Sequence, residues 1–88
     1  MKLVSGLQVR ELCGDWVAVP SGPAAKRLNG LIGLNATSAF LIAALQAETD
    51  EEAVLRQMLE KYDAPEAELR ADLAEFLDQM RELRLLEE

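Results

Sequence analysis

The 88-residue chain has no histidine and one cysteine, Cys13. These absences exclude a Cys/His metal cluster, a Ser-His-Asp triad, a Cys-His pair and an internal disulfide. Aromatic residues make up only 5% of the sequence, and no apolar run approaches the roughly 18 residues needed to span a bilayer. We therefore expect no metal, no cofactor and no membrane partner.

The length indicates a single domain, which we place over residues 1–88. Apolar residue types make up 50% of the chain, so the sequence is not a disordered acidic tail. A core this small leaves little room for a substrate cleft and a catalytic shell, which favours a binding or adaptor protein over an enzyme. Residues 1–6 lack the apolar stretch of a secretory signal, so we expect a cytoplasmic protein.

Acidic side chains are concentrated in the second half of the chain. Residues 1–49 carry four basic and three acidic side chains, whereas residues 50–88 carry five basic and thirteen acidic ones. A nucleic-acid binder usually presents a basic surface that neutralises phosphates. The distribution predicts that nucleic acid is not a partner.

The first third of the sequence is typical of strands. Apolar and polar residues alternate from Leu7, and Cys13-Gly14-Asp15 favours a turn before the β-branched and aromatic stretch that follows. We predict a hairpin with strands at 7–12 and 15–19, and a loop over 20–26. A third, glycine-broken strand is expected within residues 28–34.

The rest of the sequence predicts three helices. Asn35 is a suitable N-cap for a buried first helix over 36–47. Thr49 and Glu52 fit a capping box for a second helix that runs to about Tyr62. Pro65 suits the first turn of a third helix.

The third predicted helix is amphipathic. Its apolar residues recur at helical spacing, at Leu69, Leu73, Phe76, Leu77, Met80 and Leu83. Its acidic residues Asp72, Glu75, Asp78 and Glu82 are expected on the solvated side, as ordinary surface charges and not as catalytic carboxylates. The predicted fold class is α+β and winged-helix-like, with an N-terminal β-hairpin and a third strand packed on three α-helices.

Several segments, taken together, resemble the PqqD family, named after the pyrroloquinoline quinone biosynthesis protein D. The most specific mark is the Leu-Asn-x-Thr sequence at Leu34, Asn35 and Thr37. The resemblance spans nearly the whole chain, from about Gly6 to Leu86, and its matching segments are residues 9–20, 34–41, 49–52, 59–63 and 72–80, followed by the terminal leucines.

Two positions depart from the family pattern. Ile42 stands where the family often has tryptophan, and Arg84 stands where it commonly has glycine before a Leu-Leu pair. Because glycine is favoured in the left-handed conformation after a helix, Arg84 predicts a longer or differently capped last helix.

The resemblance implies a recognition element for ribosomally synthesised, post-translationally modified peptides. Such a domain captures the leader of a precursor peptide and presents it to a maturation enzyme, often a radical SAM enzyme. The leader adds as a strand to the third strand, beside the third helix. The peptide-binding residues implied here are Leu28, Asn29, Gly30, Leu31, Ile32, Gly33, Leu73, Phe76, Leu77 and Met80.

An exposed strand edge suits this role, because its unpaired N–H and C=O groups can pair with an extended peptide. The acidic second half further favours leaders with Lys or Arg beside their apolar residues. Two alternatives remain open. The exposed strand of a structural module can pair with a second copy to form a homodimer, and a winged-helix DNA-binding regulator would share the same elements. Against the second, the basic residues Arg56 and Lys61 lie among acidic ones.

Overall fold

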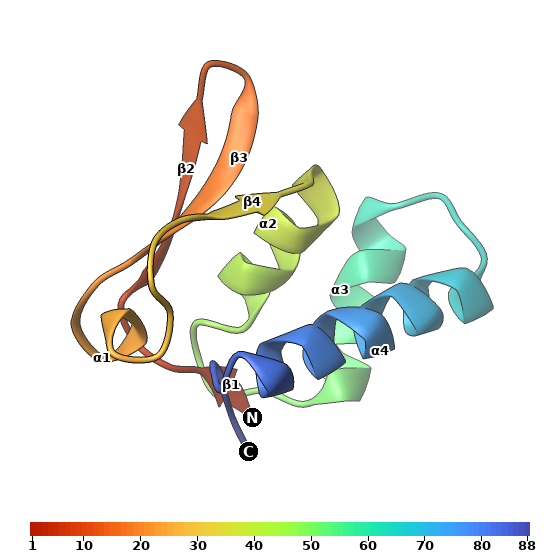
Figure 1. Ribbon diagram of the computed structural model, residues 1–88. Helices are drawn as coiled ribbons and strands as arrows, with labels where there is room; N and C mark the ends of the chain where they lie inside the picture. The colour runs from red at the N-terminus through yellow and green to blue at the C-terminus, as the bar shows by residue number, and fades with distance from the viewer.

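A computed structural model describes residues 1–88 and shows the predicted α+β class (Figure 1). An antiparallel sheet has the strand order β2-β3-β4, and helices cover one of its faces. The strands are β2 (Leu7–Leu12), β3 (Asp15–Pro20) and β4 (Ile32–Leu34), and the main helices are α2 (Ala36–Ala44), α3 (Glu51–Lys61) and α4 (Glu66–Glu82). This arrangement confirms the predicted hairpin, third strand and three helices.

The hairpin has the predicted position and turn. Leu12 pairs with Asp15, so Cys13 and Gly14 form a two-residue loop. Both residues have positive φ, 53° and 86°, as a type I′ turn requires. This turn fixes the register that pairs Val9 with Ala18, whose side chain is fully buried against the helices.

The third strand is shorter than predicted. Only Ile32–Leu34 pairs with β3, whereas residues 28–31 form a connection. The predicted loop 20–26 contains a short helix, α1 (Gly22–Ala25), which begins near Pro23. The backbone N–H of Leu28 still donates to the Ala24 carbonyl, and Gly30 then turns with a φ of 96°. The chain therefore becomes extended only after Gly30.

Two of the helix boundaries differ from the prediction. Asn35 caps α2 as expected, accepting a 2.7 Å bond from the Ser38 N–H, but α2 ends at Ala44, before the predicted end at residue 47. The predicted capping box at Thr49 is wrong, because Asp50 is the N-cap of α3 and accepts a 2.8 Å bond from the Ala53 N–H. Thr49 instead donates its N–H to the Met1 carbonyl.

The two ends of the chain pair with each other, which the sequence did not predict. Strand β1 (Lys2–Leu3) lies antiparallel to β5 (Leu86–Glu87), and Figure 1 shows the termini side by side. The N-terminal ammonium contacts Glu48 and donates to the Thr49 carbonyl, 2.7 Å away. This pairing ties the end of α4 to the start of α3.

The core lies where α4 packs on α2, α3 and the terminal strands. The predicted apolar face of α4 is buried from Leu69 to Met80, and the acidic residues Asp72, Glu75, Asp78 and Glu82 are exposed as predicted. The largest fully buried side chains are Leu41, Ile42, Leu45, Met58, Leu73, Leu77, Leu85, Val4 and Val54. No helix is long and apolar enough to cross a membrane.

The expectation that Arg84 makes the last helix longer or differently capped is wrong. The helix stops at Glu82, and Arg84 adopts the left-handed conformation with a φ of 60°. The Leu85 N–H donates to the Met80 carbonyl at 2.8 Å, and the Arg84 N–H donates to the Arg81 carbonyl at 3.0 Å. These two bonds define a Schellman cap, which forms here without glycine because burial of Leu85 stabilises it.

This cap generates a prediction about stability. Arg84→Gly removes the steric cost of a left-handed L-residue, so we expect the free energy of unfolding to rise by about 0.5–1 kcal/mol. Urea denaturation followed by circular dichroism measures the change. Arg84→Lys keeps both the charge and the strain and serves as the control. Equal stability of the Gly and Lys variants would show that Arg84 is not strained.

Candidate functional site

One edge of the sheet combines an unpaired strand with apolar neighbours. Strand β4 has β3 as its single strand partner, so its other edge is open. Its three residues, Ile32, Gly33 and Leu34, carry no charge. Proteins usually protect such edges with charged residues or cover them. The β4 edge has neither form of protection and is the first candidate for a binding surface.

A groove of about 330 Å³ runs between β4 and α4. Phe76 and Met80, only 4% and 3% exposed, form its floor, and half-buried Ile32, Leu34 and Leu83 form its apolar walls. The strand-edge groove is lined by Ile32, Gly33, Leu34, Ser38, Phe76, Gln79, Met80, Glu82 and Leu83. Apolar side chains of an extended peptide along β4 would fit this space.

The ten residues predicted for peptide binding fall into three groups. Ile32, Gly33, Phe76 and Met80 come together in the groove. Residues 28–31 precede β4, and among them Leu31 is 59% exposed.

Leu73 and Leu77 belong to the third group and lie in the core. They are 0% and 1% exposed and do not line the groove. Their position follows from the helical period, because the residues that face the centre of the core lie beside those that face β4 on the same apolar stripe. Leu73 and Leu77 could therefore affect binding only indirectly, by holding α4 in its position.

Five further residues line the groove: Leu34, Ser38, Gln79, Glu82 and Leu83. Gln79 lies three positions after Phe76, and Glu82 lies three positions after Gln79, so helical spacing makes each a neighbour of another groove residue. Ser38 comes from α2, and no sequence pattern linked it to α4. Its place in the groove depends on the packing of the two helices.

The groove continues into a smaller polar recess of about 200 Å³, where the start of α2 faces α4. The recess shares Ser38, Phe76 and Gln79 with the strand-edge groove. The polar recess is lined by Asn35, Thr37, Ser38, Leu41, Asp72, Glu75, Phe76 and Gln79. One continuous surface therefore has an apolar part beside β4 and an acidic part beside α2.

The basic side chains of α4 form ion pairs with carboxylates outside the groove. Arg70 contacts Glu52 at 2.7 Å and Glu66 at 3.3 Å, and its guanidinium lowers the pKa of the Glu52 carboxyl below its ordinary value. Arg81 contacts Asp78 at 3.0 Å and Glu88 at 2.9 Å, and lowers the pKa of Glu88. These pairs link α4 to α3 and to the C-terminus, and none involves a carboxylate of the groove.

The sheet has a second edge, on β2, with a hollow of about 420 Å³ beside α2. Gln8 and Arg10 lie along this edge, and Arg10 donates to the Gln8 side chain at 2.7 Å. Charged and polar groups of this kind limit pairing with another strand. The β2 edge is therefore the less favourable of the two for a peptide.

An apolar hollow of about 490 Å³ lies between the hairpin and the helices. It is lined by Val9, Trp16, Ala36, Ala39, Phe40, Ala43, Lys61 and Tyr62. The Phe40 and Tyr62 rings pack edge to face at 5.8 Å, with the Lys61 ammonium 5.4 Å from the Phe40 ring centre. This hollow shares no lining residue with the strand-edge groove. No group of three His, Cys, Asp or Glu side chains is placed to hold a metal ion.

The division between core and groove predicts different effects of two α4 substitutions. Leu73→Ala leaves a cavity in the core and should lower the free energy of unfolding by about 2–5 kcal/mol. Gln79→Ala truncates an exposed side chain and should change it by less than about 0.5 kcal/mol. Chemical denaturation of both variants checks the assignment. A comparable loss in the Gln79 variant would place that residue in the core instead.

Comparison with known proteins agrees with this architecture. A solved structure of TbiB1 in complex with the TbiA(beta) leader peptide has the same fold, with a TM-score of 0.73 and 18% sequence identity over 99% of this chain and 95% of that chain. No curated protein sequence matches the chain. The family model described as coenzyme PQQ synthesis protein D (PqqD) matches residues 15–86. The chain therefore belongs to the PqqD family.

Proposed function

We propose that the protein captures the leader segment of a ribosomally made precursor peptide by adding it as a strand to β4. The observation that carries this proposal is the open, uncharged β4 edge beside the apolar groove on α4. Backbone hydrogen bonds to β4 would provide affinity for any extended chain. Side chains that enter the groove at alternate positions would provide specificity.

Family membership and fold both support this proposal. The PqqD model covers residues 15–86, which include all of β4 and α4. The similar TbiB1 structure is a complex with a leader peptide. A leader that adds to β4 would extend the sheet by one strand without displacing any element of this chain.

The captured leader would be presented to a separate maturation enzyme, for which a radical SAM enzyme is our first candidate. The chain itself acts as an adaptor in this proposal and performs no catalytic step. The small size of the core supports the assignment of binding to this chain and of catalysis to a separate enzyme. The one core cluster, of 17 buried residues, packs the helices together and leaves little room for a catalytic cleft.

A homodimer is the second candidate function, because the same β4 edge could pair with the β4 edge of another copy. Each strand has only three residues, so such a pair would form few hydrogen bonds. The solution mass at micromolar concentration separates the two functions. A dimer that dissociates when leader peptide is added would show that both use the same edge.

The strand-addition mode predicts a specific loss of binding. The two-residue turn makes Leu12 and Asp15 a hydrogen-bonded pair. The alternation along the strands then directs the Ile32 N–H toward β3 and the Gly33 N–H toward the open edge. Gly33→Pro therefore removes the N–H that a leader would meet and leaves the β3–β4 bonds in place, so we expect leader affinity to fall more than about tenfold. The measurement is isothermal titration with a peptide that is selected on the unchanged protein from a displayed library of random peptides. Asp78→Asn is the control, since Asp78 is exposed and lies outside the groove, and it should bind normally and fold normally.

A peptide-side experiment avoids any effect of proline on folding. Backbone N-methylation of the leader, one residue at a time, should weaken binding at alternate positions only, because alternate N–H groups face β4. Amide chemical shifts should change at β4 and α4 and not along β2. Uniform tolerance of N-methylation, or shift changes centred on β2, would contradict the proposal.

A further inference from the structure

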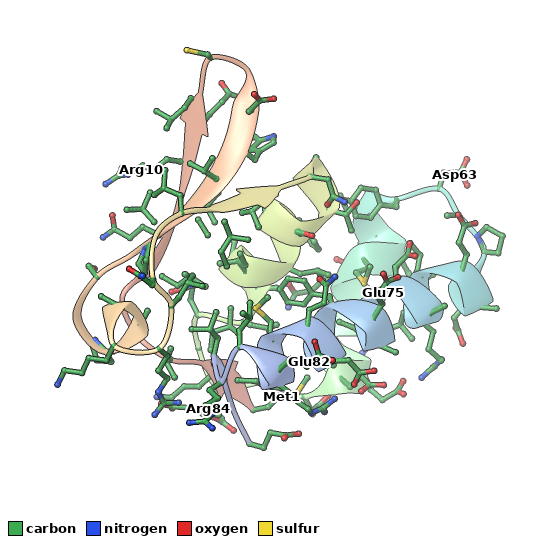
Figure 2. All side chains as sticks on the ribbon, viewed as in Figure 1. Met1, Arg10, Asp63, Glu75, Glu82 and Arg84 are labelled. Carbon is green, nitrogen blue, oxygen red and sulfur yellow. The ribbon has the colours of Figure 1, made fainter.

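Three carboxylates lie on one side of α4, along the strand-edge groove and the polar recess. Glu82 lines the strand-edge groove, and Asp72 and Glu75 line the polar recess. Glu75 and Glu82 are seven residues apart, two helical turns, and Figure 2 shows them on the same side of α4. The acidic character of the groove therefore extends along much of its length.

These carboxylates have no cationic partner within the chain. None of the three takes part in an ion pair, while Arg70 and Arg81 contact other acidic residues. In the recess, the Asn35 side-chain oxygen already accepts from the Ser38 N–H. Asp72 and Glu75 therefore present acceptors to whatever occupies the recess.

We propose that Asp72 and Glu75 select leaders that carry a Lys or Arg side chain, which enters the polar recess while an apolar side chain of the same leader fills the groove over Phe76 and Met80. This inference rests on the proposed function. An ammonium or guanidinium group suits the recess, because carboxylate oxygens are the strong acceptors for both. The Thr37 and Ser38 hydroxyls and the Gln79 amide supply further polar lining.

The geometry sets the spacing between the two leader residues. From Met80 to the middle of Asp72 and Glu75 is about 10 Å along α4, at ~1.5 Å per residue. An extended peptide covers this length in about three residues. Side chains alternate along a strand, so the two that face α4 are two or four residues apart. The proposed leader pattern is an apolar residue and a basic residue at that separation.

A pair of matched variants tests the role of the recess. Asp72→Asn with Glu75→Gln removes both recess carboxylates. Glu60→Gln with Asp63→Asn is the control, because it makes the same two chemical changes and the same change in net charge outside every hollow described above. Asp63 lies in the turn between α3 and α4 (Figure 2).

The probe is a displayed library of random twelve-residue peptides, selected against each protein. For the unchanged protein and the control, we expect selected peptides enriched in Lys or Arg two or four residues from an apolar residue. The enrichment should disappear with the recess variant. One selected peptide, measured in solution, should bind the recess variant about three- to tenfold more weakly and the control within about twofold.

The outcomes separate this inference from the proposed function. If the selected peptides lose binding to Gly33→Pro but show no basic enrichment, strand capture holds and the recess inference is wrong. Basic enrichment that survives in the recess variant also overturns it, because the net charge of the protein would then be the cause. If every selected peptide binds Gly33→Pro as it binds the unchanged protein, the proposed function itself fails.

Discussion

The packing of α4 against the core is the interaction on which the site depends. Leu69, Leu73 and Leu77 turn inward and hold the helix against α2, α3 and the terminal strands. Phe76 and Met80 are nearly buried, yet they form a floor that β4 does not cover. The groove is the space between this strand of three residues and a helix of seventeen.

The ends of α4 are held by different interactions. At its start, Arg70 connects α4 to Glu52 of α3. At its end, the Schellman cap turns the chain at Arg84 so that β5 can pair with β1. The family pattern favours glycine at this turn, and the structure shows that arginine can take the same conformation when Leu85 is buried beyond it. The departure in sequence is therefore compatible with a Schellman cap at the end of α4.

The charged side chains differ between the two sides of α4. The side away from β4 carries the ion pairs of Arg70 and Arg81, whereas the side along the groove keeps its carboxylates unpaired. Exposed ion pairs contribute little to the free energy of unfolding. The absence of such pairs at the groove carboxylates therefore lowers the stability of the fold only slightly. A cationic residue in a bound peptide would find the complementary charge along the same groove that accepts its apolar neighbour.

Features that depend on neighbours in sequence could be predicted. Cys13-Gly14 determined the hairpin turn and its register, Asn35 determined the start of α2, and the spacing from Leu69 to Met80 determined the buried face of α4. The PqqD resemblance was also carried by local segments, and the family model bears it out.

The tertiary structure decided the rest. It separated Phe76 and Met80, which line the groove, from Leu73 and Leu77, which lie in the core, although all four share one helical stripe. It paired β1 with β5, and it placed Ser38 of α2 opposite Gln79 of α4. The physical reason is that turns, caps and helical periodicity arise from interactions within a few residues. A groove and a sheet edge arise from the packing of segments far apart in the chain, and local patterns do not encode that packing.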